Sequence, residues 1–504
     1  ESAQLPAMRK VTIVLALLCC VAAQECNPRQ FTYDSVVCVC DATYCDQPGV
    51  IEFPEEGSFT VITSSREGLR FNVETLPVSS EETPDAEVVT LNKEDVYQTI
   101  LGFGGGFSDS TGYNVVSLSS ELQDQFFISY FAPEGIGYTF GRIPIAGTDC
   151  STRIYSYDDV EGDVDLEYWS LTEEDHEYKI PLILRAHDLT TYPLKLIATP
   201  WAPPAWMKSN GAVNGSGVLI REFFQPYANY IVKFVEAYEA EGVELWGLTP
   251  ANEPLGGLID WDINTCGWSS ESIRDWLKDN LGPALDTAGY SGLKIMIHDF
   301  NRNTLPWNID PILEDPDSAQ YVYGIALHWY EDTRTNPEVL DEVHELYPDR
   351  FILYTEAAHE HGIQLGSWER AEEYVNYMLD DLNHYSTGWL DWNMALDTVG
   401  GPNWIHKYRD SPIIVDAEAD EFYKQPVFYT IGHVSKFVVP GAERISWSTT
   451  ATTLQVAAFN DPSGRTVVVI LNLAEVEEDV TVTDGSETYL NFRIPAKAIQ
   501  TILY

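Results

Sequence analysis

The chain has 504 residues, of which 44% are hydrophobic and 12% aromatic, and this composition excludes a disordered or low-complexity protein. At roughly 150 residues per domain, the length predicts one large domain or two to three smaller ones. Acidic residues number 78 against 29 basic residues, which gives a formal net charge of −49. A field of that sign repels polyanions, so nucleic acid is not an expected partner.

The N-terminal residues are typical of a secretory signal peptide. Met8-Arg9-Lys10 precedes the apolar run Val11–Val21, and the small residues Ala22-Ala23 follow where a signal peptidase would cut. We therefore expect residues 1–23 to be upstream sequence and signal peptide. The apolar run is about half of the roughly 20 residues that a membrane span needs, and no later run reaches that length, so the sequence predicts no transmembrane segment.

Cysteine spacing agrees with a secretory route. Cys26, Cys38, Cys40 and Cys45 lie within twenty residues of one another. Disulfides are the default in an oxidising compartment, whereas zinc sites favour short Cys pairs at both ends, and the closest spacing here is Cys38-Val39-Cys40. We predict disulfides here. Cys150 and Cys266 stand alone, which favours small buried side chains or free thiols over a long-range pair.

From about residue 94, short β-prone runs alternate with amphipathic stretches of helical length, as in a parallel (β/α)₈ barrel. The eight runs are Val96–Phe103, Tyr138–Ala146, Leu194–Pro200, Leu245–Thr249, Leu293–His298, Tyr323–His328, Phe351–Thr355 and Gly388–Trp392. The predicted helices include Ser119–Phe131, Phe223–Glu241, Ser270–Leu281, Pro337–Leu346 and Trp368–Asn383. The expected barrel domain is therefore residues 94–437.

The two ends of the chain have a β-rich pattern without helices. Residues 438–504 contain alternating runs separated by turn signals such as Asn460-Asp461-Pro462-Ser463-Gly464. Residues 51–93 have a similar character. We expect these two segments to pair in a β-sandwich beside the barrel.

Two carboxylates occupy positions that an apolar strand end does not explain. Glu253 follows the fourth run and Glu356 ends the seventh. Active sites of such barrels lie at the C-terminal ends of the strands, and two carboxylates across one mouth are the equipment of glycoside hydrolysis. Strand-end ion pairs or helix caps are the structural alternative for either residue.

Aromatic residues also gather after the strand ends, where rings stack on sugars. They are Trp201, Trp206, Trp261, Trp268, Trp329, Tyr330, Trp389, Trp392 and Trp404. Packing between strands and helices is the alternative for each one taken singly.

Several motifs, in order along the chain, resemble those of the lysosomal glucosylceramidases, the acid β-glucosidases of glycoside hydrolase family 30. They include Ser35–Asp46, Gly102-Phe103-Gly104-Gly105, Pro200-Trp201, Asn210–Gly215, His328-Trp329-Tyr330, Asp391-Trp392-Asn393, Gly401-Pro402-Asn403-Trp404 and Phe422–Pro426. The resemblance implies a (β/α)₈ barrel, a β-sandwich, and a small disulfide-bearing β unit at residues 24–50 that pairs with part of 393–423. It also implies the pairings Cys26–Cys38 and Cys40–Cys45.

The same resemblance implies a retaining mechanism with Glu253 as acid/base and Glu356 as nucleophile. Asn252 would contact the sugar beside the reacting carbon. Asp149, Trp201, Trp392 and Asn403 would line the glucose subsite, with Arg142, His328, Trp329 and Tyr330 in or behind its first layer. The sequence gives no sign of a metal or organic cofactor.

The function expected from the resemblance is hydrolysis of glucosylceramide at a membrane surface, in the lysosome or after secretion, with a lipid-presenting activator protein as a further partner. The alternatives are another family-30 β-glycosidase activity, or a non-catalytic glycan- or lipid-binding relative, which would lack one of the carboxylates. The sequon Asn214-Gly215-Ser216 predicts a glycosylation site at Asn214. Trp261, Ile263 and Trp268 are candidate membrane anchors on a rim loop, with packing against the barrel as the alternative.

Overall fold

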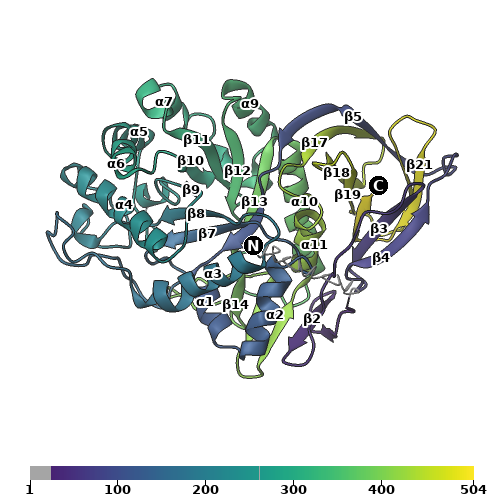
Figure 1. Cartoon of the computed structure of the whole chain (residues 1–504), viewed down its shortest axis with the longest axis horizontal. Coiled ribbons are helices and arrows are strands. Elements are labelled where there is room, and N and C mark those ends of the chain that lie inside the picture. The colour runs from purple at the N-terminus through teal and green to yellow at the C-terminus, as the bar shows by residue number, and fades with distance from the viewer. Residues whose placement is uncertain (1–23, 260) are drawn as a thin grey trace, which may run out of the picture.

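The computed structural model describes residues 24–259 and 261–504. The predicted signal peptide at residues 1–23 lies outside the described residues. The fold has a closed eight-stranded barrel, a nine-stranded sheet and a small five-stranded sheet. Figure 1 shows helices around the barrel, with α10 and α11 between the barrel and the nine-stranded sheet. Among the described residues, no helix has both the length and the apolar character needed to cross a membrane.

The barrel strands are parallel and follow one another around the ring in chain order. They are β6 (Gly102–Gly106), β7 (Phe140–Ile145), β8 (Lys195–Pro200), β9 (Gly247–Leu248), β10 (Lys294–Asn301), β11 (Val322–His328), β12 (Phe351–Glu356) and β13 (Ser386–Asn393). The helices of the chain are α1 (Asp109–Val116), α2 (Ser120–Phe131), α3 (Ile180–Leu189), α4 (Phe224–Ala240), α5 (Ser270–Trp276), α6 (Gly282–Ala288), α7 (Asp310–Leu313), α8 (Pro316–Ala319), α9 (Glu338–Leu346), α10 (Trp368–Asn383) and α11 (Pro426–Ser435). The predicted barrel class is confirmed.

Apolar side chains fill the lower part of the barrel. One fully buried residue comes from each of six strands: Phe140, Ile197, Met296, Ala326, Leu353 and Leu390. Strand side chains alternate between the two faces, so positions two residues further along each regular strand also point inward. That alternation carries Arg142, His328 and Trp392 to the C-terminal end of the barrel interior.

The first predicted strand, Val96–Phe103, is wrong as a single strand. Residues up to Thr99 belong to β5 (Glu87–Thr99), which pairs with β17 in the nine-stranded sheet, and the barrel begins at β6. Gly102, with φ +136°, occupies a conformation that only glycine adopts readily, and it separates the two strands. A β-prone run alone does not reveal that its halves pair with different sheets.

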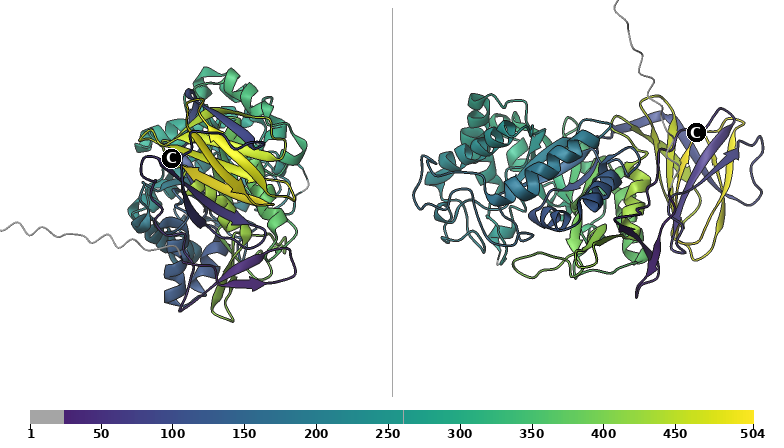
Figure 2. Two further views of the ribbon diagram at one scale, coloured as in Figure 1. Left: turned by 90° about the vertical axis from the view of Figure 1, so that its right-hand side faces the viewer. Right: turned by 60° about the horizontal axis from the view of Figure 1, so that its bottom comes forward.

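The nine-stranded sheet has the order β21-β20-β5-β17-β18-β19-β22-β3-β4 and is antiparallel except between β20 and β5. Its other strands are β3 (Ser58–Ser65), β4 (Asn72–Pro77), β17 (Glu443–Thr449), β18 (Leu454–Asn460), β19 (Thr466–Asn472), β20 (Glu478–Thr483), β21 (Tyr489–Ile494) and β22 (Ala498–Leu503). Val89, Val480 and Ile502 share one apolar cluster. Strands far apart in the sheet order thus bury a common core, as in a sandwich, and Figure 2 shows this sheet at one end of the molecule.

The N-terminal segment forms the small sheet β1-β2-β16-β15-β14. Its strands are β1 (Pro28–Gln30), β2 (Val36–Asp41), β14 (Ala395–Asp397), β15 (Ile413–Asp416) and β16 (Glu421–Lys424). The predicted disulfides Cys26–Cys38 and Cys40–Cys45 are confirmed. Cys150 and Cys266 are buried free thiols.

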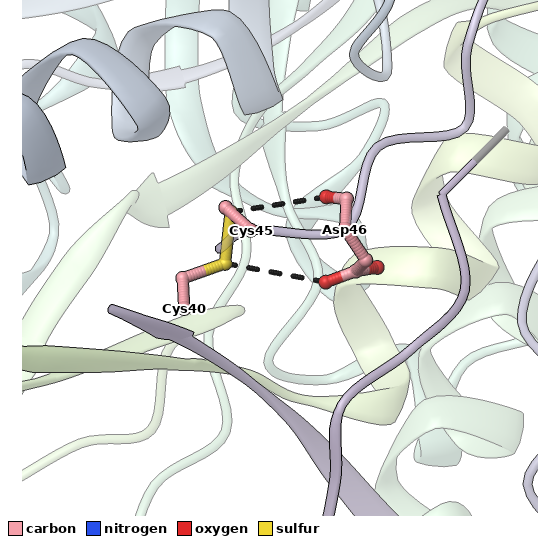
Figure 3. A group of neighbouring side chains, drawn as sticks. All are labelled: Cys40, Cys45 and Asp46. Atoms are coloured by element: carbon pink, nitrogen blue, oxygen red, sulfur yellow. Dashed lines mark hydrogen bonds between the residues drawn. A yellow bond between two sulfur atoms is a disulfide. The ribbon is translucent and has the colours of Figure 1, made fainter. Parts of the chain in front are cut away.

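Figure 3 shows the Cys40–Cys45 disulfide beside Asp46. The Asp46 carboxylate accepts a hydrogen bond from the Tyr429 hydroxyl at 2.6 Å, and the buried Lys424 ammonium lies 3.7 Å from one of its oxygens. These contacts join the disulfide-bearing unit to β16 and α11. Because both sulfurs are bonded to each other, they cannot serve as thiolate ligands, so this group of side chains is structural.

Candidate active site

Glu253 and Glu356 meet at the C-terminal end of the barrel. Glu356 is the last residue of β12, and Glu253 lies in the loop after β9. A carboxylate oxygen of each residue and a ring nitrogen of His328 all lie within 4.8 Å of one another. The two glutamates are only 8% and 5% exposed. Their charged partners, Arg142 for Glu356 and His328 for Glu253, are buried as well, so the two glutamates belong to one buried network and not to surface ion pairs.

Glu356 is held by two donors. The Arg142 guanidinium, from β7, pairs with one carboxylate oxygen, and the Tyr330 hydroxyl donates to the other at 2.6 Å. Arg142 also donates to the Asn252 side-chain carbonyl at 2.7 Å, which places that amide beside the two glutamates. The arrangement fixes the Glu356 carboxylate and favours its ionised form.

His328, at the end of β11, bridges Glu253 and a third buried carboxylate. Its Nδ1 lies 3.2 Å from Glu253, and its Nε2 lies 3.1 Å from Asp299. A ring with a carboxylate at each nitrogen donates twice and is therefore protonated. Burial alone would lower its pKa, but Glu356, Asp299 and Glu253 raise it to about 9.

The environments shift the pKa values of the two glutamates in opposite directions. Burial raises the pKa of Glu253, and the nearby Glu356 charge adds to this effect, against an opposing contribution from His328. Burial also disfavours ionisation of Glu356, but the charges of His328 and Arg142 outweigh it and lower the Glu356 pKa. Two carboxyl groups with opposed pKa shifts can act as acid and as nucleophile at the same pH.

The residues expected at the glucose subsite also cluster here. The rings of Trp201 and Trp392 stack with centroids 4.9 Å apart, and the Arg142 guanidinium lies 4.9 Å from the Trp201 ring. The Asn403 amide donates to the Asp149 carboxylate at 3.2 Å. The fold therefore brings together the residues that the family resemblance implied for the glucose subsite.

Not all of the predicted aromatics face the site. Trp329, next to the inward-facing His328, packs against Tyr374 and Trp389 and donates to the Ala358 carbonyl at 3.1 Å. It therefore lies behind the strand ends. Trp389 itself stacks on Tyr354.

Two of the three candidate membrane anchors on the loop after β9 are buried. Trp268 is 2% exposed and packs on Trp276, and Ile263 is 7% exposed, so both belong to the alternative reading of packing. The exposed apolar side chains of this loop are instead Leu258 and Ile259, at 48% and 54%. Val218 lies beside them, because it bridges to Gly267 and its neighbour Gly217 donates to the Gly257 carbonyl. We call Val218, Leu258 and Ile259 the apolar rim cluster.

Sequence reasoning missed Asp299, which is fully buried and lies between Arg142 and His328. Alternation along β10 from Met296 would place His298 inside. The pairing of β10 with β11 shifts register between His298 and Phe300, and this shift turns Asp299 inward. Its position directly after the fifth predicted run was the one available signal.

A cavity of about 410 Å³ reaches the two glutamates. Besides Glu253 and Glu356 it is lined by Trp261, Ile263, Asn301, Tyr330, Glu331, Thr333, Arg334, Glu360, Lys407 and Arg409. Asp149, Trp201, Trp392 and Asn403 are not among its lining residues. The cavity therefore adjoins the residues expected to hold glucose without including them, and its lining residue Arg409 lies 3.5 Å from the Asp149 carboxylate.

Glu253, His328 and Glu356 are close enough to share a metal ion. However, a metal ligand must offer a nitrogen lone pair, and both nitrogens of His328 face carboxylates as donors. The residues fit a proton network rather than a metal centre. The sequon residue Asn214 donates from its amide to the Asp262 carbonyl at 3.3 Å.

The parallel barrel has two buried carboxyl groups with opposed pKa shifts at the C-terminal ends of its strands. This combination is typical of the glycoside hydrolases that use a pair of carboxylates. Residues 100–438 match the family described as "Glycosyl hydrolase family 30 TIM-barrel domain", and residues 441–502 match its "beta sandwich domain". The chain belongs to glycosyl hydrolase family 30.

Relatives and solved structures agree with this assignment. The chain is 39% identical to mouse lysosomal acid glucosylceramidase over 494 residues, with 96% of each chain covered. It is 42% identical to the putative glucosylceramidase 4 of Caenorhabditis elegans, with 93% of each covered. The crystal structure of SrfJ from Salmonella typhimurium superposes with a TM-score of 0.84 at 28% identity, over 89% of this chain and 99% of that one.

Proposed function

We propose that the protein hydrolyses the β-glucosidic bond of glucosylceramide to glucose and ceramide with retention of anomeric configuration. The observation that carries this proposal is the pair of glutamates whose oxygens lie within 4.8 Å, with opposed pKa shifts. Retaining enzymes place their carboxyl groups about 5 to 5.5 Å apart, whereas inverting enzymes need about 6.5 to 9.5 Å to admit a water. Relatives named glucosylceramidase support the choice of substrate.

In the first step, ionised Glu356 attacks the anomeric carbon while protonated Glu253 donates its proton to the glycosidic oxygen. The bond to ceramide breaks, ceramide leaves as the alcohol, and glucose is esterified to Glu356. In the second step, Glu253, now ionised, takes a proton from water, which attacks the same carbon and releases glucose. Glu253 is then protonated again and Glu356 is again a carboxylate.

The surrounding residues have distinct roles in this scheme. Trp201 and Trp392 offer ring faces to glucose, Asp149 and Asn403 bind its hydroxyl groups, and the Asn252 amide lies beside the reacting carbon. Arg142 and Tyr330 keep Glu356 ionised and oriented. The cavity that reaches the glutamates receives the aglycone.

The same proposal includes a lipid surface, the lysosome as the compartment, and a lipid-presenting activator protein as partner. The mouse relative is named a lysosomal enzyme. Leu258 and Ile259 of the apolar rim cluster lie on the loop after β9, which also contributes Trp261 and Ile263 to the cavity, where an aglycone would enter from a bilayer. Arg334 and Arg409 at the mouth are paired with Glu331 and Glu360, so Lys407 is the one lining cation without a salt bridge among the described residues.

The test is hydrolysis of glucosylceramide in detergent micelles compared with a panel of soluble β-glucosides, β-xylosides and β-1,6-glucans. We expect glucosylceramide to have the highest kcat/KM, and proton NMR to show β-glucose as the first product. First release of α-glucose would overturn the retaining mechanism. Preference for a glucan or xyloside would redirect the substrate within the family, and no hydrolysis at all would favour a binding protein.

A further inference from the structure

We propose that Asp299 is a positioning residue that keeps His328 protonated and directed at Glu253. This inference rests on the proposed function, because it concerns the acid/base of the same reaction. Asp299 acts through its neighbours: in the part of the chain that the structure describes, its carboxylate makes no hydrogen bond to either catalytic glutamate.

The Asp299 carboxylate is fully buried and accepts four hydrogen bonds. Thr355 donates to Oδ1 at 2.6 Å, and His328 Nε2 lies 3.1 Å from the same oxygen. Thr249 and Arg142 each donate to Oδ2 at 2.8 Å. The charges of Arg142 and His328 outweigh burial and hold the Asp299 pKa below its usual range, so the group stays ionised.

The backbone around Asp299 is specialised for this placement. His298 has φ +82° and Asp299 φ +46°, both in the left-handed region that side chains other than glycine rarely adopt. Such strain persists where the surroundings over-determine it, often at functional sites. Here the His298 ring is anchored by Asn308 and by the Asn301 carbonyl. The Asp299 carbonyl in turn accepts a hydrogen bond from the Glu253 backbone N–H at 3.0 Å.

Several charged or titratable groups face His328 and Asp299. They are Arg142 from β7, Glu253 from the β9 loop, His298 from β10, Tyr330 from the β11 loop, Glu356 from β12 and Arg409 from the loop after β13. Among the described residues, His328 has two acidic hydrogen-bond partners, Asp299 and Glu253. Loss of the Asp299 charge therefore removes one of the two direct partners that keep the ring protonated.

Asp299→Asn isolates this role. The amide oxygen can still accept from Arg142 and Thr249, but the amide NH₂ would then face His328 Nε2, which must become an acceptor. His328 would be neutral, and Glu253 would lose the neighbouring positive charge that lowers its pKa. We expect the alkaline limb of kcat/KM on a soluble alkyl β-glucoside to move up by about one pH unit, and kcat to fall on the order of 10²-fold.

Asp175→Asn is the matched control. Asp175 is equally buried and pairs with the buried Lys179 at 2.8 Å, away from the glutamates. We expect it to lower the melting temperature without moving the alkaline limb. In a His328→Gln background, Asp299→Asn should produce no further limb shift, because the residue through which it acts is absent.

Titration of His328 by histidine NMR, assigned with His328→Gln, provides a readout that needs no substrate, and its wild-type measurement needs no Asp299 variant. In the wild-type protein we expect His328 to stay protonated at pH 7.5, and in Asp299→Asn to be neutral there. A wild-type His328 that titrates near its ordinary value, or an Asp299→Asn enzyme with reduced kcat and an unmoved limb, would overturn the inference. If the alkyl glucoside is cleaved but glucosylceramide is not, the substrate proposal fails and the role of Asp299 remains.

Discussion

Glu253 and Glu356 carry the same functional group and differ in their neighbours. Glu356 has a guanidinium and a phenol hydroxyl on its oxygens, whereas the Glu253 carboxylate has His328 alone as a hydrogen-bond partner among the described residues. One carboxyl is therefore held ionised, while burial favours the proton on the other. This difference supports the proposed roles of Glu356 as nucleophile and Glu253 as acid/base.

Substitution of the two glutamates should separate these roles. We expect Glu356→Gln to abolish turnover of every β-glucoside, because no covalent intermediate can form. Glu253→Gln should cost about 10²- to 10⁴-fold on glucosylceramide and much less on an aryl glucoside whose leaving group needs no proton. Steady-state kinetics on both substrates check this, with the exposed Glu338→Gln on α9 as a control. Equal losses on both substrates for Glu253→Gln would contradict the assignment.

The pH profile of the wild-type enzyme should depend on the same two glutamates. Activity needs Glu356 ionised and Glu253 protonated, so kcat/KM should rise as Glu356 loses its proton and fall as Glu253 does. Because the Glu253 pKa is raised and the Glu356 pKa is lowered, the optimum lies between them, on the acidic side of neutrality. Measurement of kcat/KM from pH 3 to 9 tests this, and an optimum above pH 7 would contradict it.

Between elements, a buried charge cluster joins the segment after β10, the segment after β11 and helix α10. Arg302 lies 3.1 Å from Asp332 and also pairs with Asp381, and all three side chains are almost fully buried. Tyr354, Tyr377, Asp380 and His384 are the other titratable groups around it. Two carboxylates share one guanidinium, and burial raises the pKa of Asp332 to about 7.

This cluster should make part of the stability depend on pH. A carboxyl group with a raised pKa in the folded state stabilises the fold fully below its unfolded value of about 4, and that stability is lost as the pH rises toward 7. We expect Asp332→Asn to become more favourable relative to wild type from pH 5 to 7.5, by at most about 1.4 kcal/mol per pH unit. Urea unfolding at both values checks this. The exposed Asp279→Asn should show no such trend. A pH-independent difference for Asp332→Asn would refute the raised pKa of Asp332.

At the scale of the whole molecule, the excess of acidic residues and the apolar rim cluster both bear on the proposed contact with lipid. A net charge of −49 offers no general attraction to an anionic surface. Leu258 and Ile259 are half exposed on the loop that contributes Trp261 and Ile263 to the cavity, so contact with a bilayer there would bury apolar surface.

We therefore expect Leu258→Ser with Ile259→Ser to lower activity on liposomal glucosylceramide about tenfold and to leave a soluble aryl glucoside unaffected, since 1.4 kcal/mol of lost burial corresponds to that factor. Trp268→Ala, which removes a buried ring, should lower the melting temperature and both activities. Anionic lipid should add little at neutral pH. Equal losses on the two substrates for the rim variant would show that the cluster has no part in lipid contact.

Local patterns in the sequence predicted most of the barrel. The ends of seven of its eight strands lie within about three residues of the predicted runs, and the ends of helices α2, α4, α9 and α10 lie within one residue. These elements are predictable because the periodic spacing of apolar residues is a local property of the sequence. The paired glutamates and the disulfides followed from position and from family motifs, whereas the mutual stacking of Trp201 and Trp392 was not predicted.

Other features depend on contacts between distant segments. The split of Val96–Phe103 between two sheets was decided by the partners of its halves, β17 on one side and β13 and β7 on the other. The burial of Trp268 and Ile263, rather than of Leu258, was decided by packing of the β9 loop on α5 and on the loop after β8.

Asp299 shows the same division within the site. The sequence by itself determined that carboxylates would meet at the C-terminal end of a barrel, since strand order and strand ends are local properties. Only the tertiary structure decided which carboxylates, because a one-residue shift of register in β10 reverses the inward and outward faces after it. The pKa values that separate acid from nucleophile depend in turn on those placements, since burial and neighbouring charge exist only once distant strands have come together.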